Sequence, residues 1–290
     1  MELARKTESL GYGALTMPDH FTDQLAPLPA LTAAAMATST LRIGALVWDN
    51  DYKHPVVFAK EMATLDVLSD GRLDLGIGAG WMITDYEQSG IPYESAGTRI
   101  DKMIEGIDIM KGCFAQGPFS YAGKHYTITN YNGMPKPVQG SFPPILIGGG
   151  GKRVLTYAAK VADIVGINAT MSAGAVGPEA ISTMTAEAVD AKVDIVREAS
   201  GDRINDIEMN IRAFLVNVTD DAEGAISRLA KGMGVEESMV ANTPFALMGP
   251  PSKLIEDLLA RRERWGFSYV IVGGEDVEAF APVVAALAGK

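Results

Sequence analysis

The pair Asp19-His20 is the first candidate for chemistry in this sequence. It follows a short apolar run over 14–17 that predicts a β-strand. Catalytic groups of parallel α/β proteins gather at the carboxyl ends of strands, and an imidazole there can donate or accept a proton near neutral pH. Asp19 and His20 are therefore candidate catalytic residues. The alternative is that Asp19 caps a following turn and His20 is an ordinary loop residue.

Two glycine-rich turns also follow predicted strands. In the first, Gly76-Ile77-Gly78-Ala79-Gly80, glycines let backbone approach a ring or a phosphate, but the spacing and the lack of a predicted helix after it do not match a dinucleotide fingerprint. The second, Gly148-Gly149-Gly150-Gly151, precedes a predicted helix, whose first N–H groups could bind phosphate. A tight turn is the alternative there, but four glycines exceed what a turn needs, so phosphate binding is favoured.

The other reactive side chains favour structural roles. Cys113 is the single cysteine and lies on an apolar helix face, which indicates a buried, inert thiol. His54 precedes a proline at a predicted helix start, and His125 lies in a predicted hairpin. No spacing of His, Asp and Glu suggests a metal site, so we expect none.

Short apolar runs alternate with helical segments along the whole chain, which predicts an α/β protein with a buried parallel sheet. Seven strands are expected, over 14–17, 41–48, 73–77, 144–147, 164–167, 208–218 and 269–272. A hairpin insertion is expected at 119–131, and a long loop at 81–97. We predict a (β/α)8 TIM barrel with insertions, formed as a single domain over residues 1–290, with the first strand of the eight missing from the chain.

Composition excludes some classes of protein. The 290 residues carry a formal net charge of −11, which disfavours a nucleic-acid binder because such proteins need a basic face. No apolar run reaches the roughly 18 residues needed to span a membrane, and the start of the chain has no apolar signal segment. A soluble, cytoplasmic protein with a small-molecule substrate is expected.

At these motifs the chain resembles the luciferase-like monooxygenase superfamily, and more narrowly its actinobacterial branch of oxidoreductases that use the deazaflavin coenzyme F420. The resemblance covers nearly the whole chain in the family's order. The matching stretches are 8–21 around Asp19-His20, 41–44, 54–66, 69–81, the turn at 144–151 and the closing segment 280–282.

The resemblance implies roles for the motif residues. Asp19 and His20 would lie beside the isoalloxazine-type ring, with His20 as the candidate proton donor or hydrogen-bond partner. Further cofactor-binding candidates come from three segments. The first segment is a strand bulge with a non-proline cis peptide at Leu46–Val47, where the ring would be backed by Ala45, Leu46 and Val47. The second would supply backbone along the cofactor and consists of Ala79, Gly80 and Trp81. The third would form the phosphate turn and consists of Gly148, Gly149, Gly150 and Gly151.

Two departures from the family pattern matter. Position 81 is Trp where the family's sugar-phosphate dehydrogenases carry a carboxylate, so oxidation of a sugar phosphate is not expected. The family's first strand is absent, which predicts a truncated or misassigned start, or a barrel with a gap.

The implied activity is hydride transfer between F420 and a small organic substrate, by a homodimer. FMN is the alternative cofactor and would imply a monooxygenase, because a flavin activates oxygen where a deazaflavin transfers hydride. A non-catalytic protein that binds flavin or deazaflavin is the second alternative.

Overall fold

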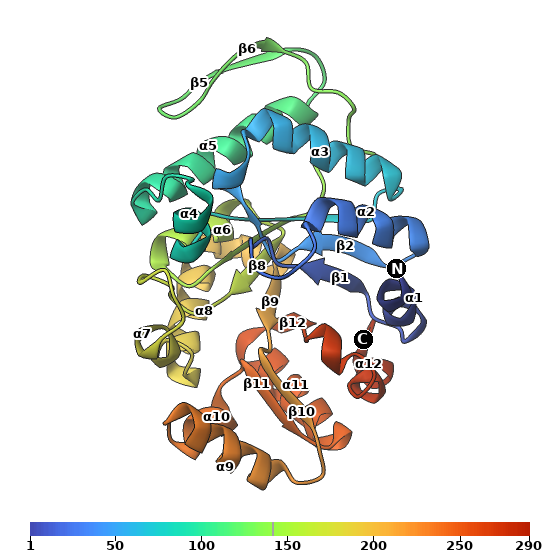
Figure 1. The fold of residues 1–290 in the computed structure, drawn as a ribbon, viewed down its shortest axis with the longest axis vertical. Helices are drawn as coiled ribbons and strands as arrows, with labels where there is room; N and C mark the ends of the chain where they lie inside the picture. The colour runs from blue at the N-terminus through green and yellow to red at the C-terminus, as the bar shows by residue number, and fades with distance from the viewer. Residues whose placement is uncertain (141) are drawn as a thin grey trace. The chain divides into compact units, whose positions relative to one another are not determined.

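The computed structural model describes residues 1–140 and 142–290. Two compact units divide the chain. The first comprises residues 1–8 and 13–148, and the second comprises residues 9–12 and 149–290. Both contain parallel strands that alternate with helices (Figure 1).

The sheet of the first unit contains the strands that precede the predicted site residues. Its order is β1-β2-β4-β7, with β3 also paired to β4, and all these pairs are parallel. The strands are β1 (Ala14–Met17), β2 (Arg42–Ala45), β3 (Trp48–Asp49), β4 (Leu73–Gly78) and β7 (Ile145–Gly149), of which the last residue belongs to the second unit. Every residue of β4 is buried, as expected of a strand covered on both faces.

Helices of the first unit follow local sequence signals. His54 caps α3, whose first residue is Pro55, and the Ser95 hydroxyl accepts a hydrogen bond from the Thr98 N–H at the start of α5. The helices are α1 (Glu2–Ser9, which ends in the second unit), α2 (Pro27–Ala37), α3 (Pro55–Leu68), α4 (Ile83–Ser89) and α5 (Ala96–Phe114). The predicted hairpin is confirmed as β5 (Phe119–Ala122) and β6 (Thr127–Tyr131), which stand out beyond α3 and α5 (Figure 1).

The second unit contains a parallel sheet of order β8-β9-β12 and a separate parallel pair, β10-β11. Its strands are β8 (Ile164–Ile167), β9 (Glu208–Arg212), β10 (Leu215–Val218), β11 (Ala246–Gly249) and β12 (Phe267–Ile271). Its helices are α6 (Lys152–Val161), α7 (Pro178–Ser182), α8 (Ala186–Ser200), α9 (Ala222–Met233), α10 (Glu237–Asn242), α11 (Pro251–Trp265) and α12 (Ala281–Leu287).

All seven predicted strands are present, but four details of the prediction were wrong. The expected strand over 41–48 is two strands, β2 and β3, with the cis peptide Leu46–Val47 between them. The expected loop at 81–97 contains α4, whose polar sequence has no apolar periodicity and which ends at Gly90 with a left-handed φ of 76°. The expected strand over 208–218 is two strands, because the chain leaves β9 and pairs again with β11. The strand β11 itself is not among the seven predicted strands. No strand precedes β1 in the described residues.

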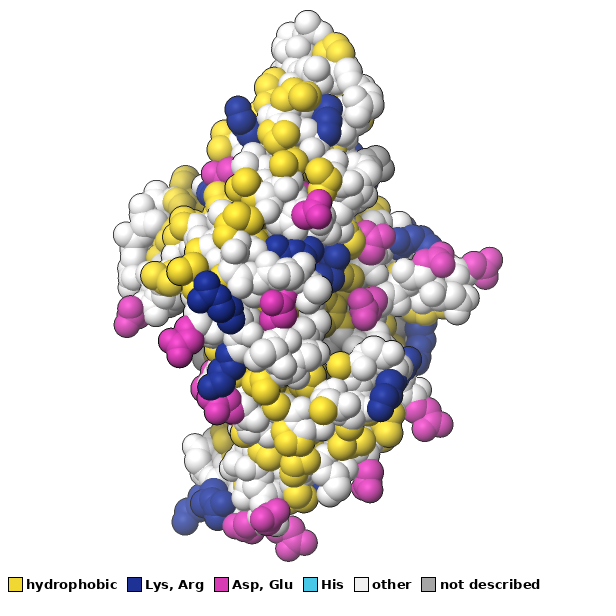
Figure 2. Space-filling model, turned by 90° about the vertical axis from the view of Figure 1, so that its right-hand side faces the viewer, with side chains coloured by type: hydrophobic (Ala, Val, Ile, Leu, Met, Phe, Trp, Pro, Cys, Tyr) yellow, Lys and Arg dark blue, Asp and Glu magenta, His cyan; other side chains and the backbone are white. Residues whose placement is uncertain are grey.

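Charged side chains of both signs are interspersed on the face shown in Figure 2, with no continuous basic area among the described residues there. No helix in residues 1–140 and 142–290 combines the length and the apolar character needed to cross a bilayer.

Glu8 gives a test of the first unit through its pH dependence. Its Oε1 accepts hydrogen bonds from the backbone N–H groups of Ser39, Thr40 and Leu41, and these bonds lower the pKa of Glu8 from 4.5 to about 2. A lowered carboxyl pKa stabilises the fold above pH 4.5, and the stabilisation is lost as the pH falls toward 2. Glu8→Gln should therefore lower the denaturation midpoint in urea at pH 7 and lower it less at pH 3; an equal loss at both values would contradict this account.

Candidate active site

His20 is held by a buried carboxylate. Its Nδ1 lies 2.7 Å from Oδ2 of Asp85, and the exposed fractions of the two side chains are 20% and 4%. The other oxygen, Oδ1 of Asp85, accepts from the Phe21 N–H at 3.2 Å, and the Tyr52 hydroxyl donates to Oδ2 at 3.1 Å. Asp85 comes from the first turn of α4 and Tyr52 from the 3-10 helix η1 (Asn50–Tyr52). Three segments of the chain therefore meet at one carboxylate.

Asp19 lies in the same region but does not cap the turn after it through any hydrogen bond of the described residues. Its Oδ2 accepts from the backbone N–H of Asp49, at 3.2 Å, and so joins the end of β1 to β3. Burial raises the pKa of Asp19, and the hydrogen bond from Asp49 opposes that rise. This contact gives Asp19 a role in holding the strand ends together.

The predicted bulge at 45–47 follows β2. The peptide bond between Leu46 and Val47 is cis, as predicted, and the Leu46 N–H donates to the carbonyl oxygen of Met17 at 2.9 Å. Glycines on the neighbouring strand make room for this segment. A β-carbon at Gly76 would overlap the Ala45 carbonyl oxygen, and one at Gly78 would lie 2.6 Å from Val47 Cγ2. Close packing against the Ala45 carbonyl oxygen and against the Val47 side chain is thus sufficient to explain both glycines.

The backbone of residues 79–81 is held by side chains of α5 and of the segment before it. The Arg99 guanidinium donates to the carbonyl oxygens of Ala79 at 3.2 Å and Gly80 at 3.4 Å, and it lies 4.2 Å from the ring centre of Tyr93. The Tyr93 hydroxyl donates to the carbonyl oxygen of Trp81 at 3.2 Å. Three successive carbonyl groups therefore have side-chain donors, which sets the course of the chain after β4.

Trp81 contacts His20. The two ring centres are 5.5 Å apart with an interplanar angle of 87°, an edge-to-face geometry. The structure therefore brings together His20 and Trp81, which are 61 residues apart in the sequence.

Asp49 is a second acidic group of the first unit. The Tyr86 hydroxyl donates to Oδ2 of Asp49 at 3.0 Å, and the Asp51 N–H donates to Oδ1 of Asp49 at 2.9 Å. Burial is the main cause that raises the pKa of Asp49 to about 7. It also raises the pKa of Tyr86, which keeps that phenol a donor.

Sequence reasoning missed Asp49, Tyr52, Asp85 and Tyr86. Asp85 and Tyr86 lie in α4, within the segment 81–97 where a loop is predicted. Without a predicted helix, their positions on a helical face could not be inferred. Asp49 follows the predicted strand over 41–48 much as Asp19 follows the predicted strand over 14–17, and this parallel was the one signal that could have found it.

The four-glycine turn begins in the first unit with Gly148 and continues in the second, where it leads into α6. The carbonyl oxygen of Gly149 accepts from the Asn168 N–H at 3.0 Å, and that of Gly150 accepts from the Thr170 hydroxyl at 3.0 Å. A β-carbon at Gly150 would overlap the carbonyl oxygen of Ala169, whereas one at Gly151 would have no neighbour within 4 Å. Gly150 therefore has a packing reason to be glycine, but Gly151 has none.

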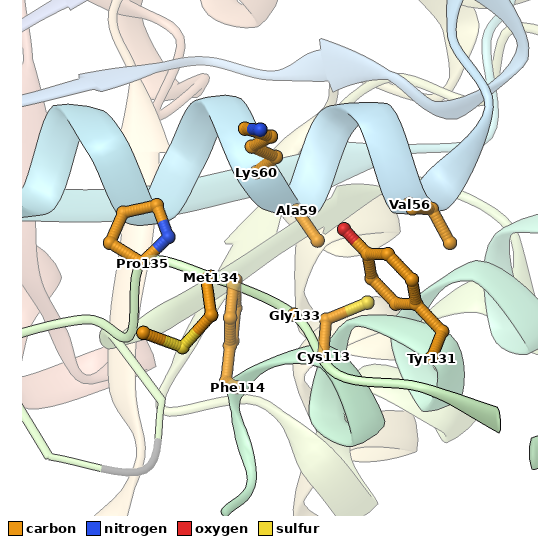
Figure 3. Close-up of a pocket in the computed structure, with 9 residues that line it drawn as sticks. All are labelled: Val56, Ala59, Lys60, Cys113, Phe114, Tyr131, Gly133, Met134 and Pro135. Carbon is orange, nitrogen blue, oxygen red and sulfur yellow. The ribbon is translucent and has the colours of Figure 1, made fainter. Parts of the chain in front are cut away.

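A small pocket near Cys113 contains none of the predicted site residues. It lies between α3, the end of α5 and the segment after β6 (Figure 3). Its lining consists of Val56, Ala59, Lys60, Cys113, Phe114, Tyr131, Gly133, Met134 and Pro135. Burial raises the pKa of the Cys113 thiol to about 11, so it stays protonated at neutral pH and is a poor nucleophile. Across the described residues, no group of three or more His, Cys, Asp or Glu side chains could hold a metal ion.

Gly80 allows a matched test of the site's backbone. Its φ is 72°, and a β-carbon there would overlap the Tyr86 hydroxyl, whereas Gly90 has a φ of 76° and nothing within 4 Å of such an atom. Both alanine variants face the left-handed backbone cost of about 1 kcal/mol, but Gly80→Ala should lose about 1–3 kcal/mol more from overpacking. Urea unfolding measures this difference; equal losses would show that the Tyr86–Asp49 contact does not restrain residue 80.

Comparison with known proteins shows the family and the fold. A model of the luciferase-like monooxygenase family matches residues 1–269. An FMNH(2)-dependent dimethylsulfone monooxygenase of Pseudomonas putida is 27% identical over 221 residues, which cover 76% of this chain and 54% of that protein. The chain thus spans about half the length of this curated relative.

Solved structures give the same fold. The coenzyme F420-dependent tetrahydromethanopterin reductase of Methanopyrus kandleri superimposes with a TM-score of 0.78 at 19% identity, over 98% of this chain and 93% of that one. An F420-dependent secondary alcohol dehydrogenase gives a TM-score of 0.77 at 18% identity, over 99% and 92%. The TIM-barrel fold class is confirmed, and the chain belongs to the luciferase-like monooxygenase family.

Proposed function

We propose that this protein is an F420-dependent oxidoreductase that transfers a hydride between the deazaflavin and a small organic substrate. The observation that carries the proposal is the fixed imidazole of His20, which is bonded to buried Asp85 and lies edge-to-face with Trp81. A hydride transfer to a C=C, C=N or carbonyl group leaves a negative charge that needs a proton, and a positioned imidazole can supply one. When bound, the cofactor supplies or accepts the hydride.

The residues fit such a cofactor in two separate respects. The ring would lie beside an apolar segment at a strand end, formed by Ala45, Leu46 and Val47. The other residues of the first unit that are proposed to bind the cofactor are Asp19, Ala79, Gly80 and Trp81. In the second unit, the open space at Gly151 lies at the start of α6, a helix of 10 residues. Backbone N–H groups at such a start favour phosphate, so Gly148, Gly149, Gly150 and Gly151 are proposed to hold it.

Two F420-dependent enzymes among the solved structures support this choice, while the FMNH(2)-dependent relative supports the alternative of an FMN monooxygenase. No carboxylate occupies position 81, so we retain the prediction that sugar phosphates are not substrates. A non-catalytic cofactor-binding protein is the third candidate. The single domain, the homodimer and the cytoplasmic location stay predictions from the resemblance and the composition.

Fluorescence titration distinguishes the cofactors. The purified chain is titrated into F420 and, separately, into FMN, and turnover is then followed with nitro, enone and ketone substrates. We expect saturable binding of F420 at lower protein concentration than FMN, and substrate-dependent oxidation of reduced F420. Binding of FMN without binding of F420 would overturn the proposal, and tight F420 binding without turnover across the panel would favour the non-catalytic candidate.

Gly151→Ala tests the phosphate turn. The backbone of Gly151 (φ −90°, ψ 147°) suits any residue, and its β-carbon would meet no protein atom within 4 Å, so the fold should tolerate alanine. If a phosphate lies against this backbone, the Kd for the cofactor should rise about tenfold, which corresponds to about 1.4 kcal/mol, while the Tm stays unchanged.

Gly177→Ala is the matched control, because Gly177 also begins a helix and its β-carbon would also meet no atom within 4 Å. It should change neither the Kd nor the Tm. An unchanged Kd for Gly151→Ala would remove this turn from the cofactor site.

A further inference from the structure

We infer that Asp85 is the positioning residue of His20: it holds the imidazole with Nδ1–H turned toward the carboxylate and leaves Nε2 as the ring nitrogen that exchanges a proton with the substrate. Tyr52 is the second anchor of the same carboxylate. This inference rests on the proposed function, in which His20 serves the reacting group, and it assigns a role to two residues that the sequence motifs do not include.

The hydrogen bonds of Asp85 determine which ring nitrogen carries the proton. An ionised carboxylate only accepts hydrogen bonds, and its Oδ2 lies 2.7 Å from Nδ1 of His20. Nδ1 must therefore be the donor. In the neutral imidazole this leaves Nε2 as an acceptor, and in the protonated imidazole Nε2 becomes a donor. With Nδ1 bonded to Asp85, Nε2 is the nitrogen left to exchange a proton in both states.

The other donors around Asp85 keep it an acceptor. The Phe21 N–H donates to Oδ1 at 3.2 Å, and the Tyr52 hydroxyl donates to Oδ2 at 3.1 Å. Burial is the main cause that raises the pKa of Tyr52, so its phenol stays protonated. With three donors on a side chain that is 4% exposed, little room is left for the carboxyl group to rotate.

Each of the two side chains that bond to the carboxylate also contacts an aromatic ring. The Tyr52 ring lies on the Phe21 ring with centres 4.5 Å apart, and the His20 ring contacts the Trp81 ring at 5.5 Å. Two other carboxylates lie nearby, and both have other hydrogen-bond partners among the described residues. Asp19 accepts from the Asp49 N–H. Asp49 accepts from the Tyr86 hydroxyl and the Asp51 N–H. Neither makes a hydrogen bond to the imidazole among the described residues, although Asp19, whose pKa is raised by burial, lies near enough for the charge of His20 to oppose that rise.

The test uses the small number of histidines. The chain contains three, so long-range proton–nitrogen NMR correlations of cofactor-free protein labelled with 15N-histidine should resolve three imidazoles. His20→Gln assigns the signal of His20, and nitrogen shifts report which nitrogen is protonated. We expect the Nδ1–H form in the natural protein.

Asp85→Asn is the decisive variant because it keeps the shape of the side chain. The Phe21 N–H would hold the amide oxygen, so the amide NH2 would face Nδ1 of His20 and favour the Nε2–H form. We expect this change of tautomer together with a fall in kcat on the order of 100-fold, and with KM and the cofactor Kd within about twofold of the natural protein. Tyr52→Phe should keep the Nδ1–H form, and Asp23→Ala, at an exposed position of the same segment, should change nothing.

The measurements distinguish failure of this inference from failure of the proposed function. A His20 that is protonated at Nε2 in the natural protein, or that keeps Nδ1–H in Asp85→Asn, would overturn the inference whether or not the protein uses F420. A normal kcat in Asp85→Asn despite a changed tautomer would also overturn it and leave the proposed function standing. Absence of turnover in the natural protein would defeat the proposed function alone, because the NMR measurement needs no cofactor.

Discussion

The close approach of β2 to β4 is the constraint on which the site depends. A β-carbon at Gly44 would overlap the Asp74 carbonyl oxygen, and one at Gly76 would overlap that of Ala45. Since neither position has a side chain, the two backbones lie closer than any other residue type would permit. This packing holds the end of β2, and hence the Ala45–Val47 segment, directly against the strand that leads to Ala79 and Gly80.

Beyond the strand ends, the framework changes from backbone pairing to side-chain hydrogen bonds. Arg99 and Tyr93 bond to successive carbonyl groups after β4. Asp85 bonds to groups from the segments after β1 and β3, and Asp19 bonds to the last residue of β3. Loops at the carboxyl end of a parallel sheet have no ladder to order them, so buried polar side chains take over this task.

The sequence predicted the strands well because buried parallel strands are continuous apolar runs, as in β4. It predicted the candidate residues His20, Ala45–Val47 and Gly148–Gly151 from local patterns and from the family resemblance. It could not reveal that His20 and Asp85 meet, since their contact spans 65 positions and Asp85 lies in a short helix without apolar periodicity. The glycines Gly76 and Gly78 show the reverse error, because a pattern that suggested ligand approach is explained by packing of the protein itself.

The buried carboxyl group of Asp49 has a thermodynamic consequence for the whole fold. Burial raises its pKa from 3.8 to about 7, so the folded chain binds a proton that the unfolded chain releases across that interval. Its contribution therefore works against folding as the pH rises from 3.8 to about 7, opposite in sign to that of Glu8, which favours folding as the pH rises from about 2 to 4.5. Two acidic side chains of the same unit thus make the stability of the fold depend on pH in opposite senses.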